Sequence, residues 1–181
     1  MKPIFVIFFL LLAGSLHARS NVVNLDSNGL SLLNHTDYSP SLTTSGQPTQ
    51  EELALIASAG FDRVIFLAFT NHPKAVSHED DIVRDQGLQF IHIPVEWDSP
   101  SPADFAAFAA VMQTFGSGRT LVHCEVNSRA SVFDFLYQVL FEGADVDEAM
   151  SMMQSIWVAH DTWEAFIVRV VNDNGVDYPA L

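Results

Sequence analysis

Stretches with helical periodicity alternate with short apolar runs through the middle of this chain, and that alternation restricts the fold more than any other feature. Thr49 and Glu52 have the spacing of a capping box, and the helical pattern that they open ends at Gly60. The next run, RVIFLAF at residues 63–69, is rich in β-branched and aromatic residues, which is typical of a buried strand. A helix that leads into a buried strand predicts a parallel sheet covered by helices.

The same alternation occurs twice more. A short helix opened by Ser77 is expected over residues 77–86, with a strand following at residues 88–95. Ser101 then starts a helix that leads into a strand at residues 119–124. The sequence therefore predicts an α/β fold, a three-layer sandwich with a central, largely parallel sheet of about four to five strands flanked by helices. Three further helical patterns complete the chain, at residues 130–143, 145–157 and 161–171, with Gly143 as the first break.

The N-terminus has the features of a signal peptide. Lys2 precedes the apolar run IFVIFFLLLAG, and the small-residue exit SLHA follows it. We predict a signal peptide at residues 1–18 with cleavage after Ala18, which places the mature protein in the periplasm or outside the cell. Retention as an anchor is less favoured, because the apolar run is shorter than the about 20 residues that a membrane span requires. Residues 19–40 are expected to form a polar N-terminal extension, and residues 41–175 a single domain.

The charge balance excludes two classes of partner. The chain has 22 acidic and 8 basic residues and a net charge of -14, and removal of Lys2 would make it one unit more negative. Nucleic acids and acidic lipids are held mainly by lysine and arginine, so we expect neither a nucleic-acid partner nor a membrane partner after signal cleavage. The sequence leaves the oligomeric state open.

The single cysteine, Cys124, cannot form an internal disulfide, so it is either buried and inert or kept as a thiol for chemistry. Most histidines are scattered without the spacing of metal ligands, and we therefore predict no metal and no cofactor. These histidines are His35, His72, His78, His92 and His160.

Two polar segments have simple structural interpretations. The residues HEDD at 78–81 are expected to be a solvated helix face, and FTNHPKA at 69–75 a surface loop. An alternative for this loop is that it extends over a substrate pocket, with Lys74 as a phosphate contact.

The segment TLVHCEVNSRAS at residues 120–131 lies where an apolar run ends and a helical pattern begins. At such a junction in a parallel sheet, free backbone N–H groups and the positive end of the helix dipole favour anions. A Cys124 thiolate would be favoured there, and Arg129 would bind two oxygens of an oxyanion with its planar guanidinium. The alternative is a small buried thiol that lies near Arg129 by chance.

The motif VHCEVNSRAS resembles the signature of cysteine-dependent protein tyrosine and dual-specificity phosphatases, in which His-Cys is followed by five residues, Arg, and Ser or Thr. SGQPTQEELALIASAGFDRVIFL and HIPVEWDSP are similar to segments of bacterial phosphatase-like proteins of this superfamily, so the resemblance spans roughly residues 40–140. It implies a tyrosine-phosphatase-like fold, with residues 41–175 as the phosphatase-like domain. It also implies a phosphorylated small molecule or a phosphoprotein as the partner.

The resemblance implies a role for each residue of the motif. Cys124 would attack phosphorus to form a thiophosphoryl intermediate, and His123 would orient the loop. Asp98, in the loop after the second predicted strand, is the candidate general acid, with Glu96 as the alternative. Ser131 would hydrogen-bond the thiolate, although it also suits a helix-terminus cap. The residues expected to contact substrate are His123, Glu125, Val126, Asn127, Ser128 and Ser131.

This loop departs from the phosphatase pattern in three respects. Four residues, rather than five, separate Cys124 from Arg129, and a shift of one residue at the start of a helix turns a side chain by about 100°. The loop lacks glycine, and Asn127 is the residue best suited to a left-handed backbone position in its place. Glu125 adds a negative charge beside the thiol, which disfavours both a thiolate and bound phosphate.

Two alternative functions follow from these departures. A six-residue loop from cysteine to arginine also resembles the loop of rhodanese-type sulfurtransferases, in which Cys124 would carry a persulfide. The missing glycine and Glu125 also fit a catalytically weak phosphatase-like binding module. A cysteine-dependent phosphatase is the first hypothesis, because the segments upstream of the loop are more similar to the phosphatase-like proteins.

Overall fold

The computed structural model describes residues 29–176. The signal peptide predicted at residues 1–18 and the first part of the extension predicted at residues 19–40 lie outside the described residues. No helix within the described range is long and apolar enough to span a bilayer.

A five-stranded sheet lies at the centre of the molecule, with its strands in the order β1-β2-β5-β3-β4. Neighbouring strands from β2 to β4 are parallel, and β1 at the edge is antiparallel to β2. This arrangement confirms the predicted α/β class and the largely parallel sheet. The strands are β1 (Thr36–Ser39), β2 (Leu42–Ser45), β3 (Arg63–Phe66), β4 (Gln89–His92) and β5 (Thr120–His123).

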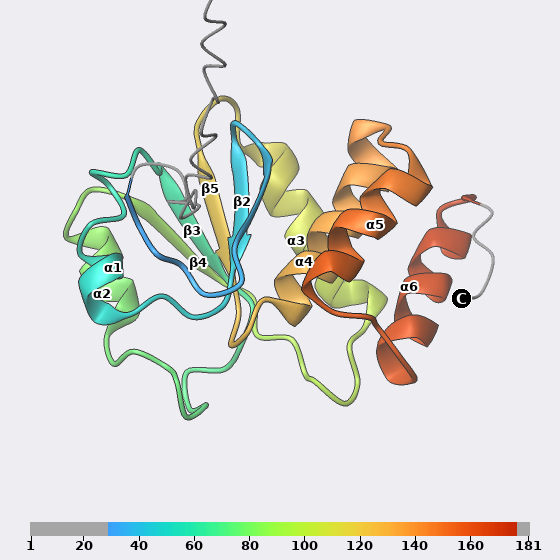
Figure 1. Ribbon diagram of the computed structural model, residues 1–181, viewed down its shortest axis with the longest axis horizontal. Helices are drawn as coiled ribbons and strands as arrows, with labels where there is room; N and C mark the ends of the chain where they lie inside the picture. Colours follow the sequence, from blue (N-terminus) through green and yellow to red (C-terminus); the bar gives the residue numbers. More distant parts are fainter. Residues whose placement is uncertain (1–28, 177–181) are drawn as a thin grey trace, which may run out of the picture.

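Helices cover both faces of this sheet (Figure 1). The two short helices α1 and α2 lie on one side, over a core that includes Leu53, Ile56 and Val83. The four longer helices lie on the other side, over a larger core that includes Phe108 and Phe133. The helices are α1 (Gln50–Leu53), α2 (Glu79–Arg84), α3 (Pro102–Thr114), α4 (Ser128–Tyr137), α5 (Val146–Ile156) and α6 (Thr162–Asp173), with a π-helical turn, η1 (Gln138–Glu142), after α4.

Local sequence signals set the beginnings and ends of several helices. The predicted capping box of Thr49 and Glu52 is present at α1, although the α-helix ends at Leu53 and turns continue to Gly60. Ser101 forms a second capping box at the start of α3. Gly143 ends the helical segment after α4 in a left-handed conformation, as predicted.

The start predicted for α2 at Ser77 is wrong. The helix begins at Glu79, because His78 has a φ of 57° and so interrupts the right-handed helical backbone.

Residues 29–40, in the predicted N-terminal extension, pack against the domain. Leu30 and Leu32 are buried in the core beside α1 and α2, and residues 36–39 form the edge strand β1. The sequence pattern did not indicate β1 or β2. Every residue of β2 is buried although three of the four are Thr or Ser, so the apolar alternation that reveals a strand is missing.

Candidate functional site

Cys124 directly follows β5, and α4 begins at Ser128. The predicted junction between a strand and a helix is therefore present. The Cys124 side chain has no exposed area and carries a free thiol. Its backbone N–H donates to the Ser45 carbonyl at the end of β2 (3.2 Å), so the sheet holds the first residue of the loop.

Asn127 has a φ of 78° and is the N-cap of α4. This confirms the prediction that asparagine takes the left-handed position that a glycine-free loop requires. Its Nδ2 atom donates to the Asn34 carbonyl, and Asn34 Nδ2 donates to the Val126 carbonyl (3.1 Å). The N-terminal segment therefore braces the loop by a reciprocal pair of amide hydrogen bonds.

Gly46 allows this close approach of segments. A Cβ atom at this position would lie 2.9 Å from the Leu33 side chain and 3.1 Å from the Val126 backbone. The Gly46 N–H also donates to the Leu33 carbonyl (2.7 Å). A larger residue would separate the loop from the segment that braces it.

Arg129 lies on the first turn of α4 and is 9% exposed. Its Nε atom donates to the Val95 carbonyl (3.0 Å), and its guanidinium carbon lies 5.1 Å from the centre of the Trp97 ring. With the described residues, neither Nη atom makes a hydrogen bond or an ion pair. Two of its three nitrogens are therefore available to an anion, even though the arginine comes one position early in the loop.

Arg129 lines a cavity of about 340 Å³. Two carboxylates, Glu96 and Glu125, line the same cavity, and neither is within ion-pair distance of the guanidinium. Cys124 is not a lining residue, which agrees with its complete burial. The full lining comprises Ala68, Phe69, Asn71, His72, Glu96, Glu125 and Arg129.

The two carboxylates considered as general acids occupy different positions. Both side chains are exposed, and of the two only Glu96 lines the cavity. Trp97 lies between them, and its carbonyl accepts a hydrogen bond from Trp163 Nε1 (3.0 Å). The position of Glu96 favours it over Asp98, in contrast to the preference drawn from the sequence.

His123 does not reach the cavity, because it packs into the interior. Its Nε2 atom lies 2.7 Å from Glu79 Oε1, and both side chains are buried. Its ring stacks on Phe66, with the ring centres 4.7 Å apart. The Gln47 side-chain amide donates to the other oxygen of Glu79 (2.8 Å).

The prediction of a solvated helix face at residues 78–81 is wrong for Glu79. It was expected on a solvated face, but it is 5% exposed and pairs with the histidine next to Cys124. Burial raises the pKa of its carboxyl, but His123 and Gln47 outweigh burial and hold that pKa below its ordinary value. Its acidic neighbours Asp80 and Asp81 are more exposed, as expected for a solvated face.

The loop at residues 69–75 contributes Phe69, Asn71 and His72 to the cavity. Burial lowers the pKa of His72, and Arg129 lowers it further, although the Glu125 charge acts in the opposite direction. His72 is therefore neutral at pH 7. Lys74, the phosphate contact considered for this loop, is exposed and does not line the cavity.

Ser128 and Ser131 hold the start of α4. The Ser131 hydroxyl donates to the Ser128 carbonyl (3.0 Å), and Trp157 Nε1 donates to the same carbonyl (3.1 Å). The Ser131 proton is therefore not directed to the Cys124 sulfur, as the phosphatase pattern implied. Ser131 is also not a helix cap, because Asn127 has that position.

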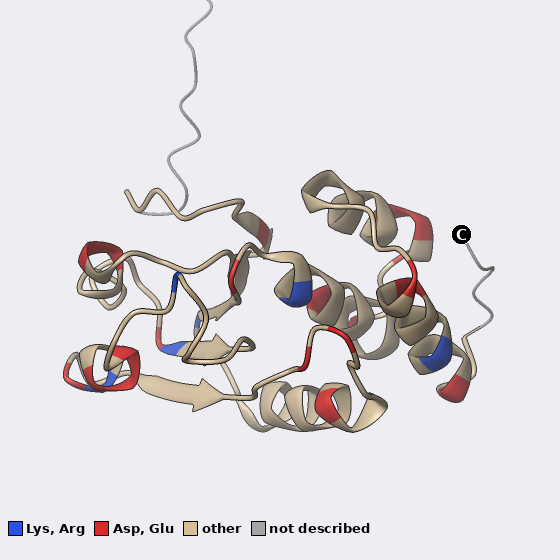
Figure 2. Ribbon diagram, turned by 90° about the horizontal axis from the view of Figure 1, so that it is seen from below, with Lys and Arg blue, Asp and Glu red and all other residues tan. Residues whose placement is uncertain are grey.

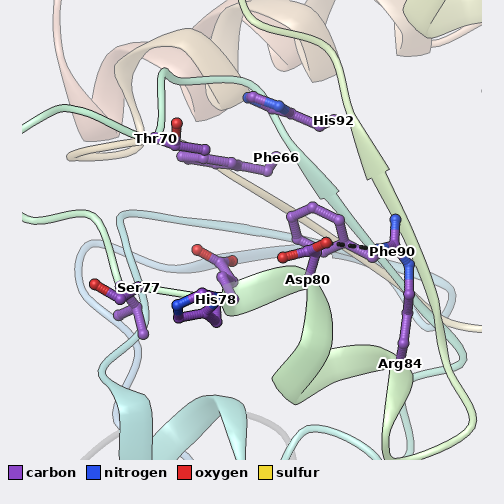
Figure 3. A pocket seen from close by; sticks show the side chains of 10 residues that line it. Phe66, Thr70, Ser77, His78, Asp80, Arg84, Phe90 and His92 are labelled. Atoms are coloured by element: carbon purple, nitrogen blue, oxygen red, sulfur yellow. Dashed lines mark hydrogen bonds and ion pairs between the residues drawn. The ribbon is translucent and has the colours of Figure 1, made fainter.

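A larger cavity of about 510 Å³ is lined by Phe66 of β3 and by residues of β4 and α2 (Figure 3). His92 stacks on Phe66 there, with the ring centres 4.9 Å apart, and Asp80 pairs with Arg84 across the rim (2.6 Å). No residue of the loop from Cys124 to Arg129 lines it. Glu79 lines this larger cavity and also contacts His123.

A second buried carboxylate, Asp134, lies on α4, one turn after Arg129. Among the described residues, neither of its oxygens makes a hydrogen bond of good geometry, although the Gln138 side chain lies close enough to affect its pKa. Burial raises the pKa of Asp134 well above its ordinary value, and the Glu142 charge adds to this, whereas Gln138 lowers it. Burial likewise raises the pKa of Tyr38.

Among residues 29–176, no group of three or more His, Cys, Asp or Glu side chains is placed to hold a metal ion. Acidic positions are spread over helices and loops on both sides of the sheet, whereas basic positions are few (Figure 2). In this negative surrounding, Arg129 is the one Lys or Arg among residues 29–176 that lines the cavity beside the loop.

Comparison with known proteins agrees with this architecture. No family model matches the sequence, and no curated protein matches it. A DUF442 protein with a proposed phosphatase function, from Shewanella putrefaciens CN-32, superposes with a TM-score of 0.73 at 30% identity, covering 80% of this chain and 95% of that one. P. aeruginosa TpbA, in a variant complexed with phosphotyrosine, gives a TM-score of 0.61 at 19% identity, covering 80% and 85%.

A third solved structure is kinase associated phosphatase, with its catalytic cysteine replaced by serine. It gives a TM-score of 0.65 at 13% identity, covering 76% of this chain and 89% of that one. The fold is thus that of the cysteine-based tyrosine and dual-specificity phosphatases. The similarity to the Shewanella protein goes further, and the chain belongs to the same family of phosphatase-like proteins, DUF442.

Proposed function

We propose that this protein hydrolyses phosphomonoesters, with Arg129 binding the phosphoryl oxygens beside Cys124. The observation that carries the proposal is the Arg129 guanidinium, which is nearly buried and lines a cavity next to the cysteine loop, with both Nη atoms unpaired among the described residues. A planar guanidinium with both Nη atoms unpaired can donate hydrogen bonds to two oxygens of a phosphoryl group. The amides at the start of α4 add donors for the same anion.

The reaction would proceed in two steps. The Cys124 thiolate attacks phosphorus, the bond from phosphorus to the leaving oxygen breaks, and a carboxylic acid gives that oxygen its proton. Water then attacks the thiophosphoryl group, which releases phosphate and restores the thiolate. The Cys124 side chain has no exposed area, so the phosphoryl group has to enter the loop between Cys124 and Arg129 to reach the sulfur.

The experiment is hydrolysis of an aryl phosphate by the reduced protein. Replacing the nucleophile in Cys124→Ser should lower kcat/KM at least about a thousandfold, and Arg129→Lys, which loses the two-pronged contact, about a hundredfold. Arg169→Lys, at an exposed position of α6, is the matched control and should leave the rate unchanged. Undiminished hydrolysis by Cys124→Ser would exclude a thiol mechanism.

Two further variants separate the candidate acids. We expect Glu96→Gln to lower kcat for a substrate with a poor leaving group more than Asp98→Asn does, because Glu96 lines the cavity and Asp98 does not. The difference should shrink for a leaving group such as 4-nitrophenolate, which needs no proton. The reverse order would restore Asp98 as the acid.

A rhodanese-like sulfurtransferase is the second candidate, favoured by the four-residue separation of Cys124 and Arg129. The Cys124 thiolate would take the sulfane sulfur of thiosulfate and release sulfite, and cyanide would remove that sulfur as thiocyanate. Thiocyanate formation that depends on Cys124, without phosphate release, would replace the first proposal. A catalytically weak binding module would show neither product, but its melting temperature would rise with phosphate.

We further propose that the protein is exported, on the basis of the signal-peptide pattern at residues 1–18. Fractionation of cells that express the full chain tests this. The expected product lies outside the cytoplasm and begins at Arg19, whereas an uncleaved cytoplasmic product would contradict export.

A further inference from the structure

The cavity beside the cysteine loop contains charges of both signs that do not neutralise one another. Arg129 has no ion-pair partner among the described residues, and neither do Glu96 and Glu125, although all three line the same cavity of about 340 Å³. Opposite charges that share a cavity normally pair when their geometry allows it. Here the protein keeps them apart, so each is free to pair with a ligand.

Backbone and aromatic contacts keep Arg129 away from the carboxylates. Its Nε atom is bound to the Val95 carbonyl, and its guanidinium lies against the Trp97 ring. Glu125 is placed by its own backbone, because its carbonyl accepts a hydrogen bond from the Gln47 N–H (3.2 Å). The separation of the three charges is therefore built into the loop and its supports.

The charge of the cavity is negative overall. Two carboxylates outnumber one guanidinium, and His72, which also lines the cavity, adds no positive charge at pH 7 because its pKa is lowered. A phosphate group bound by Arg129 brings further negative charge close to Glu96 and Glu125, and this repulsion weakens its binding. A ligand that also carries a cation would relieve it.

We propose that the preferred substrate is a small phosphomonoester whose alcohol carries an ammonium group, with the phosphate on Arg129 and the ammonium on Glu125 and Glu96. This substrate class rests on the proposed function, since it names the ester that the same site would hydrolyse. The size of the cavity fits a small molecule, because it is near the lower end of the range for ligand sites, about 300–1,000 Å³.

The experiment uses three aryl phosphates that differ in the charge of one substituent: 4-(aminomethyl)phenyl, 4-methylphenyl and 4-carboxyphenyl phosphate. The wild-type protein should prefer the cationic ester over the neutral one by roughly threefold to tenfold in kcat/KM, and should use the anionic ester least. Glu125→Gln should bring the ratio of cationic to neutral ester close to one. Asp85→Asn, at an exposed position outside the cavity, makes the same change in net charge and should keep the wild-type ratio.

Binding of the same esters to Cys124→Ser removes the influence of the leaving group, because no bond breaks. Isothermal titration should show the same order of affinity, and the preference should weaken at high salt. An equal preference in the wild type and in Glu125→Gln, or tighter binding of the neutral ester, would overturn the inference.

The same experiments distinguish failure of the proposed phosphatase activity from failure of the proposed substrate class. If no ester is hydrolysed but the cationic ester still binds best and loses this advantage in Glu125→Gln, the site is selective without being a phosphatase. If the neutral ester is hydrolysed through Cys124 with no charge preference, the phosphatase proposal stands and the substrate class is wrong. If no ester binds, both proposals fail.

Discussion

Two buried carboxylates on opposite faces of the sheet have opposite environments. Glu79, on α2, has His123 at 2.7 Å and a hydrogen bond from Gln47, and its pKa is lowered. Asp134, on α4, has no hydrogen bond of good geometry to either oxygen among residues 29–176, and burial raises its pKa. Burial alone does not decide whether an acid is charged, because partners decide whether the charge can be retained.

Each acid belongs to the structure at one end of the cysteine loop. Glu79 contacts the histidine that precedes Cys124, whereas Asp134 lies on α4, the helix whose first turn carries Arg129. The first is expected to stabilise the fold through its contacts with His123 and Gln47, and the second to reduce its stability at neutral pH. Substitutions at the two positions should therefore have opposite signs.

The largest expected effect is that of Glu79→Gln. Removing the charge leaves His123 buried without its carboxylate, and breaking a buried pair in this way should lower the free energy of unfolding by about 3 kcal/mol at pH 7. Urea unfolding measures it. Asp80→Asn, which removes the partner of Arg84 in an exposed pair on the same helix, is the matched control and should cost less than about 1 kcal/mol.

The loss of stability caused by Glu79→Gln should become smaller at acid pH. The folded pKa of Glu79 lies below the unfolded value of 4.5, so its contribution is present above pH 4.5 and is lost as the pH falls through the folded pKa. The wild type and Glu79→Gln should therefore converge in stability at acid pH. A difference that stays constant down to pH 3 would contradict the assigned pKa.

Asp134→Asn should have the next largest effect, in the opposite direction. Because the folded pKa is raised above the unfolded value of 3.8, the unfolded chain releases a proton that the folded chain retains, and stability falls as the pH rises through this interval. The variant should be more stable than the wild type by about 1–2 kcal/mol at pH 7 and by much less near pH 4. Thermal unfolding at both pH values tests this, with the exposed Asp173→Asn as the control.

The smallest effect should come from a neutral hydrogen bond at the same loop. Trp157→Phe removes the donor to the Ser128 carbonyl but keeps an aromatic ring, and it should cost about 1 kcal/mol. The loss should not change with pH, in contrast to both carboxylates. A pH-dependent loss would mean that Trp157 acts on one of the buried acids.

The layered fold could be predicted because its signals are local. Caps at Thr49 and Ser101, the stop at Gly143 and the apolar runs of β3 and β5 each act within a few residues. The strand β2 gave no such signal, since its Thr and Ser residues are buried only because β1 and β5 lie on either side of it.

In the site, too, features set by local sequence could be predicted and features set by distant residues could not. The left-handed position of Asn127 follows from a local backbone preference and was predicted. The burial of Glu79 depends on His123, which is distant in sequence, so no local pattern could reveal it. The choice between Glu96 and Asp98 depends on which of them faces Arg129, and only the arrangement of the loops determines that.

The tryptophans have a practical consequence for optical measurements. All three tryptophans of the chain, Trp97, Trp157 and Trp163, are mutual neighbours with ring centres 5.1–6.2 Å apart, and Trp97 lies against Arg129. The tryptophan fluorescence of the protein therefore originates beside the candidate anion site. Its emission is a label-free reporter of any ligand that displaces the guanidinium from the indole.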